Sequence, residues 1–317
     1  MDNGDNNGKK RLVIIDSHSL IHRAYHALPP LTTKKGQEVG AVYGFLLFFL
    51  KILKELNPDF IMATFDLPFP TFRHKKFKLY KANRPKTDPE LSQQIPKTKE
   101  ILESFGVPVF EKEGFEADDL IGTISKLAQE KTSFPPVEII ILSNDFDVMQ
   151  LINSQTKVYS LKKGVKEGVI YDQNSIKDKY QGLSPGQLVD FKSLRGDPSD
   201  NIAGVKGVGE KNALWLIKEF GDLDNLYREI EEGTEKAGRI KSGIKKALTE
   251  QKGEALLSKE LVRIRCDVPI DFNLEKSWLE GYDKNKVVGI LNELEFYSLI
   301  RRLPDIEECK KDQNLVK

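Results

Sequence analysis

Short apolar runs that each lead into an aspartate are the feature that most constrains the fold of this 317-residue chain. The pattern occurs in three places: residues 12–15 before Asp16, residues 60–65 before Asp66, and residues 137–142 before Asp145 and Asp147. Runs of this length, separated by helix-like segments, are typical of buried parallel strands. Because ligands bind outside the carboxyl ends of such strands, the pattern predicts an α/β sheet with an acidic pocket at one edge.

A second acidic group follows the apolar run Val107–Phe110, at the start of an expected helix. It consists of Glu116, Asp118 and Asp119. The helix dipole favours negative charge at a helix start, and this alone accounts for many such groups. Together with the strand-end aspartates, however, these acids predict one pocket in which the carboxylates repel one another. Cations are needed to neutralise that repulsion. Hard divalent ions with oxygen ligands are the natural choice.

Residues 72–86 interleave basic side chains with aromatic ones and contain no acid. A charged run is often only a solvated face. This one follows closely on Asp66, and bases mixed with stacking rings are typical of single-stranded nucleic acid binding. The formal net charge of +1 hides this segregation, so the overall charge predicts nothing about partners.

Two sets of side chains in the expected helix after the first strand can each be interpreted in two ways. His18, His22 and His26 have the spacing to line one helix face as metal ligands, but neither Cys nor a suitably placed acid completes a zinc set. Arg23 lies just beyond a strand-end carboxylate. There a guanidinium can hold a phosphate with two hydrogen bonds or make an ordinary ion pair.

Other classes of protein are disfavoured by composition. The two cysteines, Cys266 and Cys309, support no disulfide framework or cysteine metal site, so a reducing cytosol fits. The most apolar stretch, residues 41–53, is shorter than the roughly 20 apolar residues that a membrane span needs. It predicts a buried helix. Residues 1–10 are polar and lack the apolar core of a signal peptide.

After residue 172 the strand patterns give way to helical ones, so we expect a domain boundary near residues 173–182. The glycines of Gly204–Lys211 allow a tight turn with exposed amides ahead of a helix, which is an anion site on physical grounds. It is not a Walker loop, because Gly-Lys-Ser/Thr is missing.

Taken in order, these residues resemble the 5′ nuclease family, which includes the 5′→3′ exonuclease domain of bacterial DNA polymerase I, its stand-alone bacterial and phage relatives, and flap endonucleases. The resemblance runs from Arg11 to about Pro304. The motifs that carry it are Val13-Ile14-Ile15-Asp16, Thr64-Phe65-Asp66, Phe72-Arg73, Tyr80-Lys81-Ala82-Asn83-Arg84-Pro85, Gly114-Phe115-Glu116-Ala117-Asp118-Asp119, Asn144-Asp145-Phe146-Asp147, Gly196-Asp197-Pro198-Ser199-Asp200-Asn201 and Gly204 to Lys211.

The resemblance implies a PIN-like α/β core, with a mostly parallel sheet flanked by helices, and a helical C-terminal region containing a helix-three-turn-helix DNA-binding motif. In the family a potassium ion is often held at that motif. The expected divisions are a disordered lead-in at 1–10, the exonuclease core at 11–175 with a basic arch near 67–100, the helical DNA-binding region at 176–303, and a flexible tail at 304–317.

The resemblance also implies roles for individual residues. The expected metal ligands are Asp16, Asp66, Glu116, Asp118, Asp119, Asp145, Asp147, Asp197 and Asp200. The expected catalytic residues are Lys81, Arg84 and Asp119. The expected DNA-binding residues are Arg23, Phe72, Arg73, Tyr80, Lys81, Arg84, Lys206, Gly207, Gly209 and Lys211, with Tyr80 stacking on a terminal base.

The function expected from this set is hydrolysis of DNA phosphodiesters near a 5′ end or 5′ flap, including RNA primers, with two or more Mg²⁺ or Mn²⁺ ions. We expect a monomer in the bacterial cytoplasm, associated with the nucleoid and not with a membrane, with a DNA polymerase in cis or in trans. The chain is either a stand-alone exonuclease or an excised domain. Two alternatives are a non-catalytic DNA-junction-binding protein and a PIN-type ribonuclease. The complete set of acidic residues disfavours a non-catalytic junction-binding protein. The glycine-rich segment Gly204–Lys211, which is expected to bind duplex phosphates, disfavours a ribonuclease.

Overall fold

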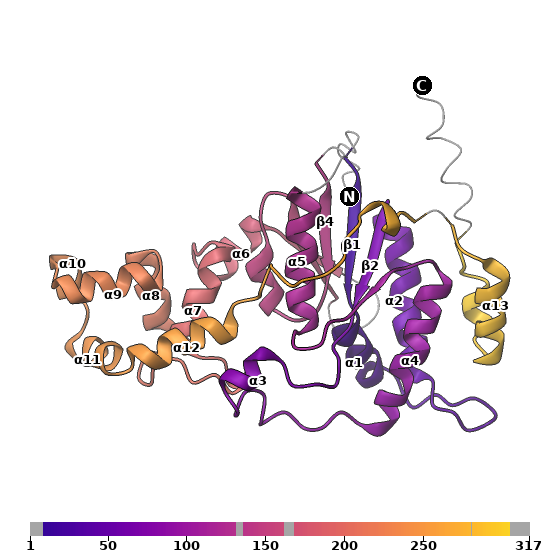
Figure 1. The fold of residues 1–317 in the computed structure, drawn as a ribbon, viewed down its shortest axis with the longest axis horizontal. Coiled ribbons are helices and arrows are strands. Elements are labelled where there is room, and N and C mark those ends of the chain that lie inside the picture. The colour runs from indigo at the N-terminus through magenta and orange to yellow at the C-terminus, as the bar shows by residue number, and fades with distance from the viewer. Residues whose placement is uncertain (1–8, 131–135, 162–167, 280, 305–317) are drawn as a thin grey trace.

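A six-stranded sheet forms the centre of the computed structural model, which describes residues 9–130, 136–161, 168–279 and 281–304 (Figure 1). The spatial order is β3-β2-β1-β4-β5-β6, and every pairing is parallel except that of β5 with β6. The strands are β1 Arg11–Asp16, β2 Phe60–Thr64, β3 Val109–Phe110, β4 Glu138–Leu142, β5 Thr156–Leu161 and β6 Gly168–Tyr171. Residues 1–8 of the expected lead-in and the expected tail beyond Pro304 lie outside the described residues.

The strand order reverses at β1, because β2 lies on one side of it and β4 on the other. Ile15 of β1 is in register with Ala63 of β2 and with Leu142 of β4. The three aspartate-bearing strand ends therefore meet at one edge of the sheet, as predicted, and this switch point is where open α/β sheets bind ligands.

The apolar strands feed two separate cores, one on each face of the sheet. Val13 and Ile15 pack into one core and Leu12 and Ile14 into the other, because successive side chains of a strand point to opposite faces. All four side chains are fully buried, which explains the continuous apolar run in the sequence.

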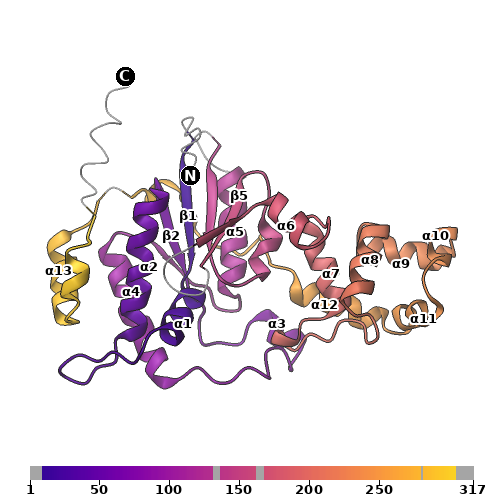
Figure 2. The same ribbon diagram turned by 180° about the vertical axis from the view of Figure 1, so that it is seen from behind.

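Helices cover both faces of the sheet (Figures 1 and 2). The first face carries α1 Ser17–Ala27, α2 Gly40–Leu56, α4 Pro89–Ser104, α13 Lys284–Glu293 and α14 Tyr297–Ile300. The second carries α5 Ala117–Glu130, the 3₁₀ turn η1 Asp147–Leu151 and α6 Gln173–Lys179. The apolar α2 is a buried core helix, as predicted. In the described ranges we find no helix with the length and apolar character to cross a membrane.

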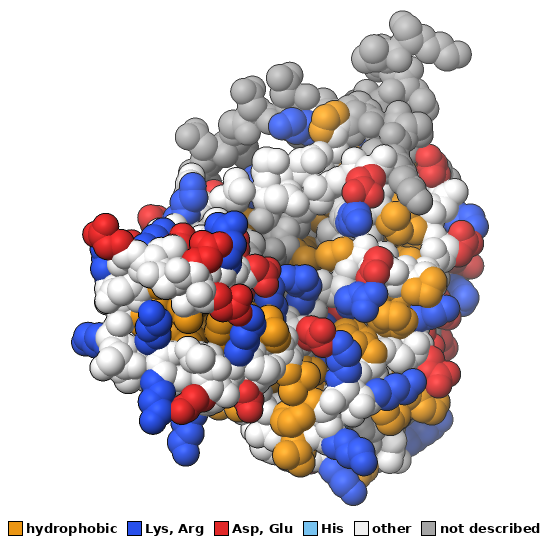
Figure 3. Space-filling view, turned by 60° about the vertical axis from the view of Figure 1, so that its left-hand side comes forward, with side chains coloured by type: hydrophobic (Ala, Val, Ile, Leu, Met, Phe, Trp, Pro, Cys, Tyr) orange, Lys and Arg blue, Asp and Glu red, His pale blue; other side chains and the backbone are white. Residues whose placement is uncertain are grey.

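A helical unit with its own apolar core extends from one side of the sheet, as Figure 1 shows. Its elements are η2 Pro185–Gln187, α7 Leu188–Arg195, η3 Pro198–Asp200, α8 Glu210–Phe220, α9 Leu223–Glu232, α10 Glu235–Gly238, α11 Ser242–Glu250 and α12 Lys252–Val262. On the face of this unit seen in Figure 3, lysine and arginine side chains are spread among acidic ones and do not form one continuous basic patch.

After α12 the chain returns to the sheet through residues 263–279, which include the 3₁₀ turn η4 Glu275–Ser277. Ile264 and Leu274 pack into the core under α5, and α13 packs beside α2 and α4. Residues 263–279 and 281–303, which the sequence grouped with the helical region, thus lie on the α/β core.

The basic segment runs along the lower side of the molecule in Figure 1, below the sheet, from α3 toward the start of α4. It contains the short helix α3 Phe72–Lys76 and the turns of residues 78–84. We call residues 67–88 the arch segment. Its hydrogen bonds reach the loop before α8, since Lys81 N donates to Asp200 O at 3.0 Å and Asn201 Nδ2 to Leu79 O at 2.7 Å.

Candidate active site

A cleft of about 800 Å³ opens at the carboxyl edge of β1, β2 and β4, between the sheet, α4 and the arch segment. Five predicted metal ligands line it: Asp16, Asp66, Glu116, Asp118 and Asp145. We call these five residues the acidic cleft. Two come from strand ends, two from the start of α5 and one from the loop after β4. The parallel strands bring three of them to one edge, and a hydrogen bond from Ala117 N to Asp66 places the start of α5 beside them.

Asp16 and Asp66 also hold the elements around the cleft in place. Asp16 caps α1 by accepting a hydrogen bond from Ser19 N at 3.1 Å, and it accepts another from Ser143 Oγ at 2.5 Å. Asp66 accepts a hydrogen bond from Ala117 N at 2.7 Å, which fastens the first turn of α5 to the end of β2. The capping role common for strand-end aspartates is therefore present here beside the pocket role.

The acidic cleft carries more negative charge than its surroundings neutralise. Burial, with repulsion from Asp145 and Asp66, raises the pKa of Asp16 to about 7. Burial and the charges of Asp145 and Asp16 raise the pKa of Asp118 well above its ordinary value. Buried carboxylates that repel one another are the oxygen-rich setting that a hard divalent cation fits.

Among the residues that the structure describes, no three His, Cys, Asp or Glu side chains converge on one point as a finished metal site. Basic partners hold several of the acids. Lys81 Nζ lies 3.0 Å from Glu116 Oε2, and Arg84 pairs with Asp200. The donor types fit a divalent cation, and of the five cleft carboxylates Glu116 is the one that the Lys81 ammonium group occupies.

The predicted catalytic residues Lys81 and Arg84 both line the cleft. Lys81 has a left-handed backbone, with φ 56°, at the turn of the arch segment. Its ammonium group lies 3.9 Å from Asp200 Oδ2 in addition to its contact with Glu116. The structure thus brings two cations to the rim of a pocket whose floor is acidic.

Asp147 and Asp197 form a second acidic group, joined by Lys192 of α7 and outside the cleft lining. Burial raises the pKa of Asp147 to about 6. At Asp197 burial acts in the same direction, but the bond and charge of Lys192, 2.8 Å away, outweigh it and lower the pKa to about 2. Lys192 is not among the site residues predicted from the sequence. The only sequence signal for it is its position five residues before Asp197.

The structure gives Asp119 a different place from the one predicted. Its side chain is fully buried and outside the cleft. It accepts two hydrogen bonds from the Arg73 guanidinium, at 2.7 and 2.8 Å, and others from Glu116 N at 3.1 Å and Arg265 N at 2.8 Å. Both oxygens are occupied, so the predicted metal and catalytic roles of Asp119 do not fit this arrangement.

Arg73 is also buried, at 2% exposure, and so does not present a DNA-binding surface. Besides its bonds to Asp119 it donates to two backbone carbonyls, Leu261 O of α12 at 2.8 Å and Arg263 O just after that helix at 2.9 Å. The nearby carboxylates raise its pKa despite its burial. The Arg73–Asp119 pair therefore fastens α3 to α5 and to the segment after α12.

Tyr80 differs from its prediction for a similar reason. It is only 3% exposed, and its hydroxyl lies 3.1 Å from both Glu116 Oε2 and Asp200 Oδ2. The ring packs with Val189, Ile202 and Leu261. It is a buried link between the arch segment and the helical unit, and stacking on a terminal base is excluded in this arrangement.

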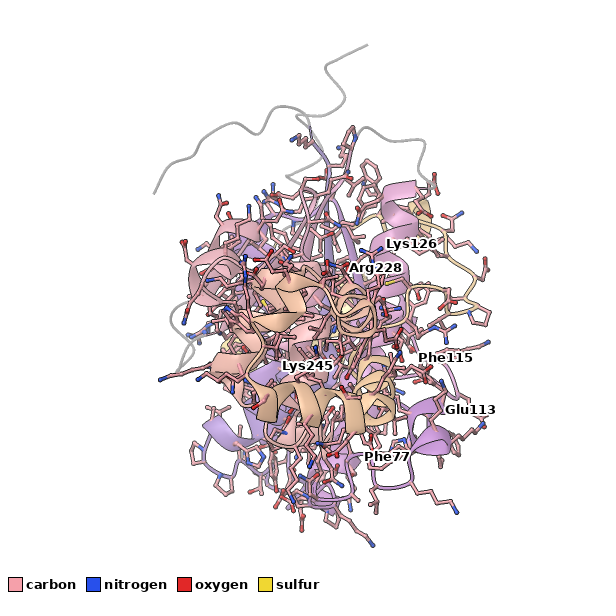
Figure 4. All side chains as sticks on the ribbon, turned by 90° about the vertical axis from the view of Figure 1, so that its left-hand side faces the viewer. Phe77, Glu113, Phe115, Lys126, Arg228 and Lys245 are labelled. Atoms are coloured by element: carbon pink, nitrogen blue, oxygen red, sulfur yellow. The ribbon has the colours of Figure 1, made fainter. Side chains whose placement is uncertain are left out.

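The remaining predicted DNA-binding residues are divided between the two parts of the molecule. Arg23 is half-buried on α1, and Phe72 is half-buried beside the guanidinium groups of Arg73 and Arg265. In the helical unit, four residues are exposed in the loop before α8 and at its start: Lys206, Gly207, Gly209 and Lys211. In Figure 4 the helices carrying Arg228 and Lys245 face the viewer, with Phe77 of the arch segment below them.

The histidines of α1 form a stripe, with ring centroids 6.5 Å apart for His18 and His22 and 6.4 Å for His22 and His26. His18 and His22 line the cleft. His18 Nδ1 accepts a hydrogen bond from Asp66 N at 3.1 Å, which requires an unprotonated nitrogen. Burial lowers the pKa of His18, in agreement with this acceptor role.

An acidic pocket with two cations beside it, at the switch point of the sheet, can bind a phosphate group together with divalent cations. A family model described as 5′-3′ exonuclease, N-terminal resolvase-like domain, matches residues 11–181, and one described as 5′-3′ exonuclease, C-terminal SAM fold, matches residues 183–285. The chain belongs to the 5′-3′ exonuclease family and is a nuclease, as the motifs predicted.

Two curated relatives are DNA polymerases I. The chain is 41% identical over 308 residues to that of Bacillus subtilis, with 97% of this chain and 34% of the relative covered. It is 38% identical over 299 residues to the thermostable enzyme of Thermus thermophilus, with 94% and 34% covered. The chain therefore spans about a third of the length of these relatives.

Two solved structures share the fold. A flap endonuclease of bacteriophage T5, in a complex with DNA and metal ions, aligns with a TM-score of 0.65 at 18% identity and covers 90% of this chain and 100% of its own. The catalytic core of Rad2 with a DNA substrate aligns at 0.59 and 18% identity, over 94% and 93%. The predicted PIN-like class, a mostly parallel sheet with a helical C-terminal region, is confirmed.

Proposed function

We propose that this chain hydrolyses DNA phosphodiesters near a 5′ end or at a 5′-flap junction, RNA primers included, with two or more divalent cations. The observation that carries the proposal is that five carboxylates line one cleft together with Lys81 and Arg84. Relatives named DNA polymerase I and a T5 flap endonuclease solved with DNA and metal ions support it.

The acidic cleft would hold the cations through Asp16, Asp66, Glu116, Asp118 and Asp145, and we propose Mg²⁺ or Mn²⁺. When bound, such ions supply an activated water and stabilise the leaving oxygen. Lys81 and Arg84 bind the reacting phosphate by exchanging their present partners, Glu116 and Asp200, for phosphate oxygens. We propose Asp147, Asp197 and Asp200 as the remaining metal ligands, which in this arrangement pair with Lys192 and Arg84.

The segment Gly204–Lys211, in which residues 206, 207 and 209–211 are exposed, is our candidate for binding duplex phosphates. Gly207 has φ +97°, a conformation that side chains disfavour, and Lys206 and Lys211 flank it as phosphate-binding cations. We propose that this loop binds duplex phosphates away from the cut, with a K⁺ ion at its carbonyls.

We further propose a monomer that works in the bacterial cytoplasm at the nucleoid, with a DNA polymerase in cis or in trans.

The decisive experiment uses a 5′-flap duplex labelled at either end, incubated with the protein and Mg²⁺ or with a chelator. We expect metal-dependent products whose lengths place the cuts at the junction or step by step from the 5′ end. Asp145→Asn is the matched inactive variant. Binding without cleavage in every divalent metal would instead support a junction-binding protein, and cleavage of single-stranded RNA only would support a PIN-type ribonuclease.

A further inference from the structure

The cleft has an apolar wall beside its acidic floor. Leu67, Pro68 and Phe69, directly after Asp66, line it together with Ile95 and Pro96 of α4. Phe69 is 52% exposed, among the highest exposures of any large apolar side chain in the described chain. An isolated exposed phenylalanine is ordinary on a protein surface. One that lines a polar cleft together with other apolar side chains is a recognition feature.

The position of Phe69 is restrained by its neighbours in the chain. Pro68 and Pro70 flank it, and a proline fixes its own backbone φ and disfavours the helical conformation of the residue before it. The ring is thus held at the cleft on a stiff turn, so little conformational freedom is lost when it binds a planar partner.

The partner of this wall follows from the two kinds of chemistry in the cleft. The acidic floor and the cations Lys81 and Arg84 suit a phosphate with divalent ions, whereas Phe69 and Pro96 offer flat apolar surface. A nucleotide is the ligand that carries a phosphate and a flat base on one small frame. Tyr80, the aromatic residue expected to stack, has no exposed ring face to offer.

We infer that Phe69 is a specificity-determining residue whose ring stacks on an unpaired nucleobase of the substrate strand beside the reacting phosphate. This inference rests on the proposed nuclease function. Stacking on aromatic side chains tolerates any base sequence, because every base has a flat face. Phe69 would therefore favour substrates with an unpaired base at the cut over fully paired ones. Loss of the ring should weaken binding of such substrates roughly 5- to 100-fold.

The test combines an enzyme variant with a missing base. Flap substrates carrying one abasic site, moved through the two nucleotides on each side of the cut, are cleaved in single turnover by wild type, Phe69→Ala and Phe69→Trp. We expect one abasic position that slows wild type and Phe69→Trp but has little further effect on Phe69→Ala. Leu79→Ala is the matched control, because Leu79 is 57% exposed on the same arch segment and lies outside the cleft.

A second measurement reads the contact without cleavage. With 2-aminopurine at the sensitive position and a chelator present, wild type should quench its fluorescence and Phe69→Ala should not. Equal abasic sensitivity and equal quenching in wild type and Phe69→Ala would overturn the stacking while leaving the nuclease function intact. A wild-type protein that neither cleaves nor binds the flap would remove both proposals.

Discussion

Asp118 and Asp119 are neighbours in the sequence, and the structure predicts opposite effects for the same substitution at each. Asp119→Asn leaves the Arg73 guanidinium buried without a full countercharge, and breaking a buried pair in this way costs about 3–5 kcal/mol. At about 2.1 cal/mol/K for each of the 317 residues, one kcal/mol corresponds to about 1.5 °C, so the melting temperature should fall by about 6 °C. Asp118→Asn removes a charge that Asp145 and Asp16 repel, so the metal-free protein should become more stable.

Divalent metal separates the two variants further. Ligand binding stabilises a protein by about 2.7 kcal/mol when the free ion is at 100 times its Kd. Asp119→Asn should keep this gain, because Asp119 lies outside the cleft. Asp118→Asn should lose at least about 1.4 kcal/mol of it, which corresponds to tenfold weaker binding.

Urea unfolding of wild type and both variants, with chelator and with Mg²⁺, measures all these quantities. The double variant Arg73→Met with Asp119→Leu is the control, since replacing a whole buried pair with apolar side chains should recover much of the stability lost in Asp119→Asn. The reasoning fails if Asp119→Asn unfolds within about 1 kcal/mol of wild type and loses its response to Mg²⁺. Asp119 would then be the metal ligand that the sequence predicted.

Three further outcomes are expected. Lys81→Ala and Arg84→Ala should each lower the single-turnover rate by about 10²-fold on a 5′-flap substrate, and unchanged rates with weaker affinity would reveal binding roles only. With chelator present, the free energy of unfolding should fall as pH rises from about 4 to about 7, because burial raises the pKa of Asp16 to about 7 and the unfolded chain gives up that proton first. Urea titrations across this range should show a flatter profile for Asp16→Asn. Gly207→Val, at φ +97°, should weaken duplex binding and make its salt dependence shallower, and Gly209→Val, at φ −76°, should weaken it less because its backbone is unstrained and only the added side chain meets the DNA.

The sequence by itself determined the sheet, the position of the acidic cleft and the family. Residues 12–15, 60–65 and 137–142 are apolar enough to require burial on both faces, and such runs separated by helices form parallel strands. Parallel strands align their carboxyl ends, so Asp16, Asp66 and Asp145 had to meet at one edge. The buried helix α2 followed from an equally local pattern.

Only the tertiary structure decided which side chains face the cleft. Consecutive residues of a helix differ in direction by about 100°, so Asp118 reaches the cleft while Asp119 turns toward Arg73 and the segment 261–265. That segment lies more than 140 residues away in the sequence. Contacts of this kind also bury Tyr80 and bring Lys192 to Asp147, whereas Phe69 is left exposed because no distant element covers it in the described chain. Local sequence patterns do not reveal such contacts, because the contacting residues belong to chain segments that meet only after folding.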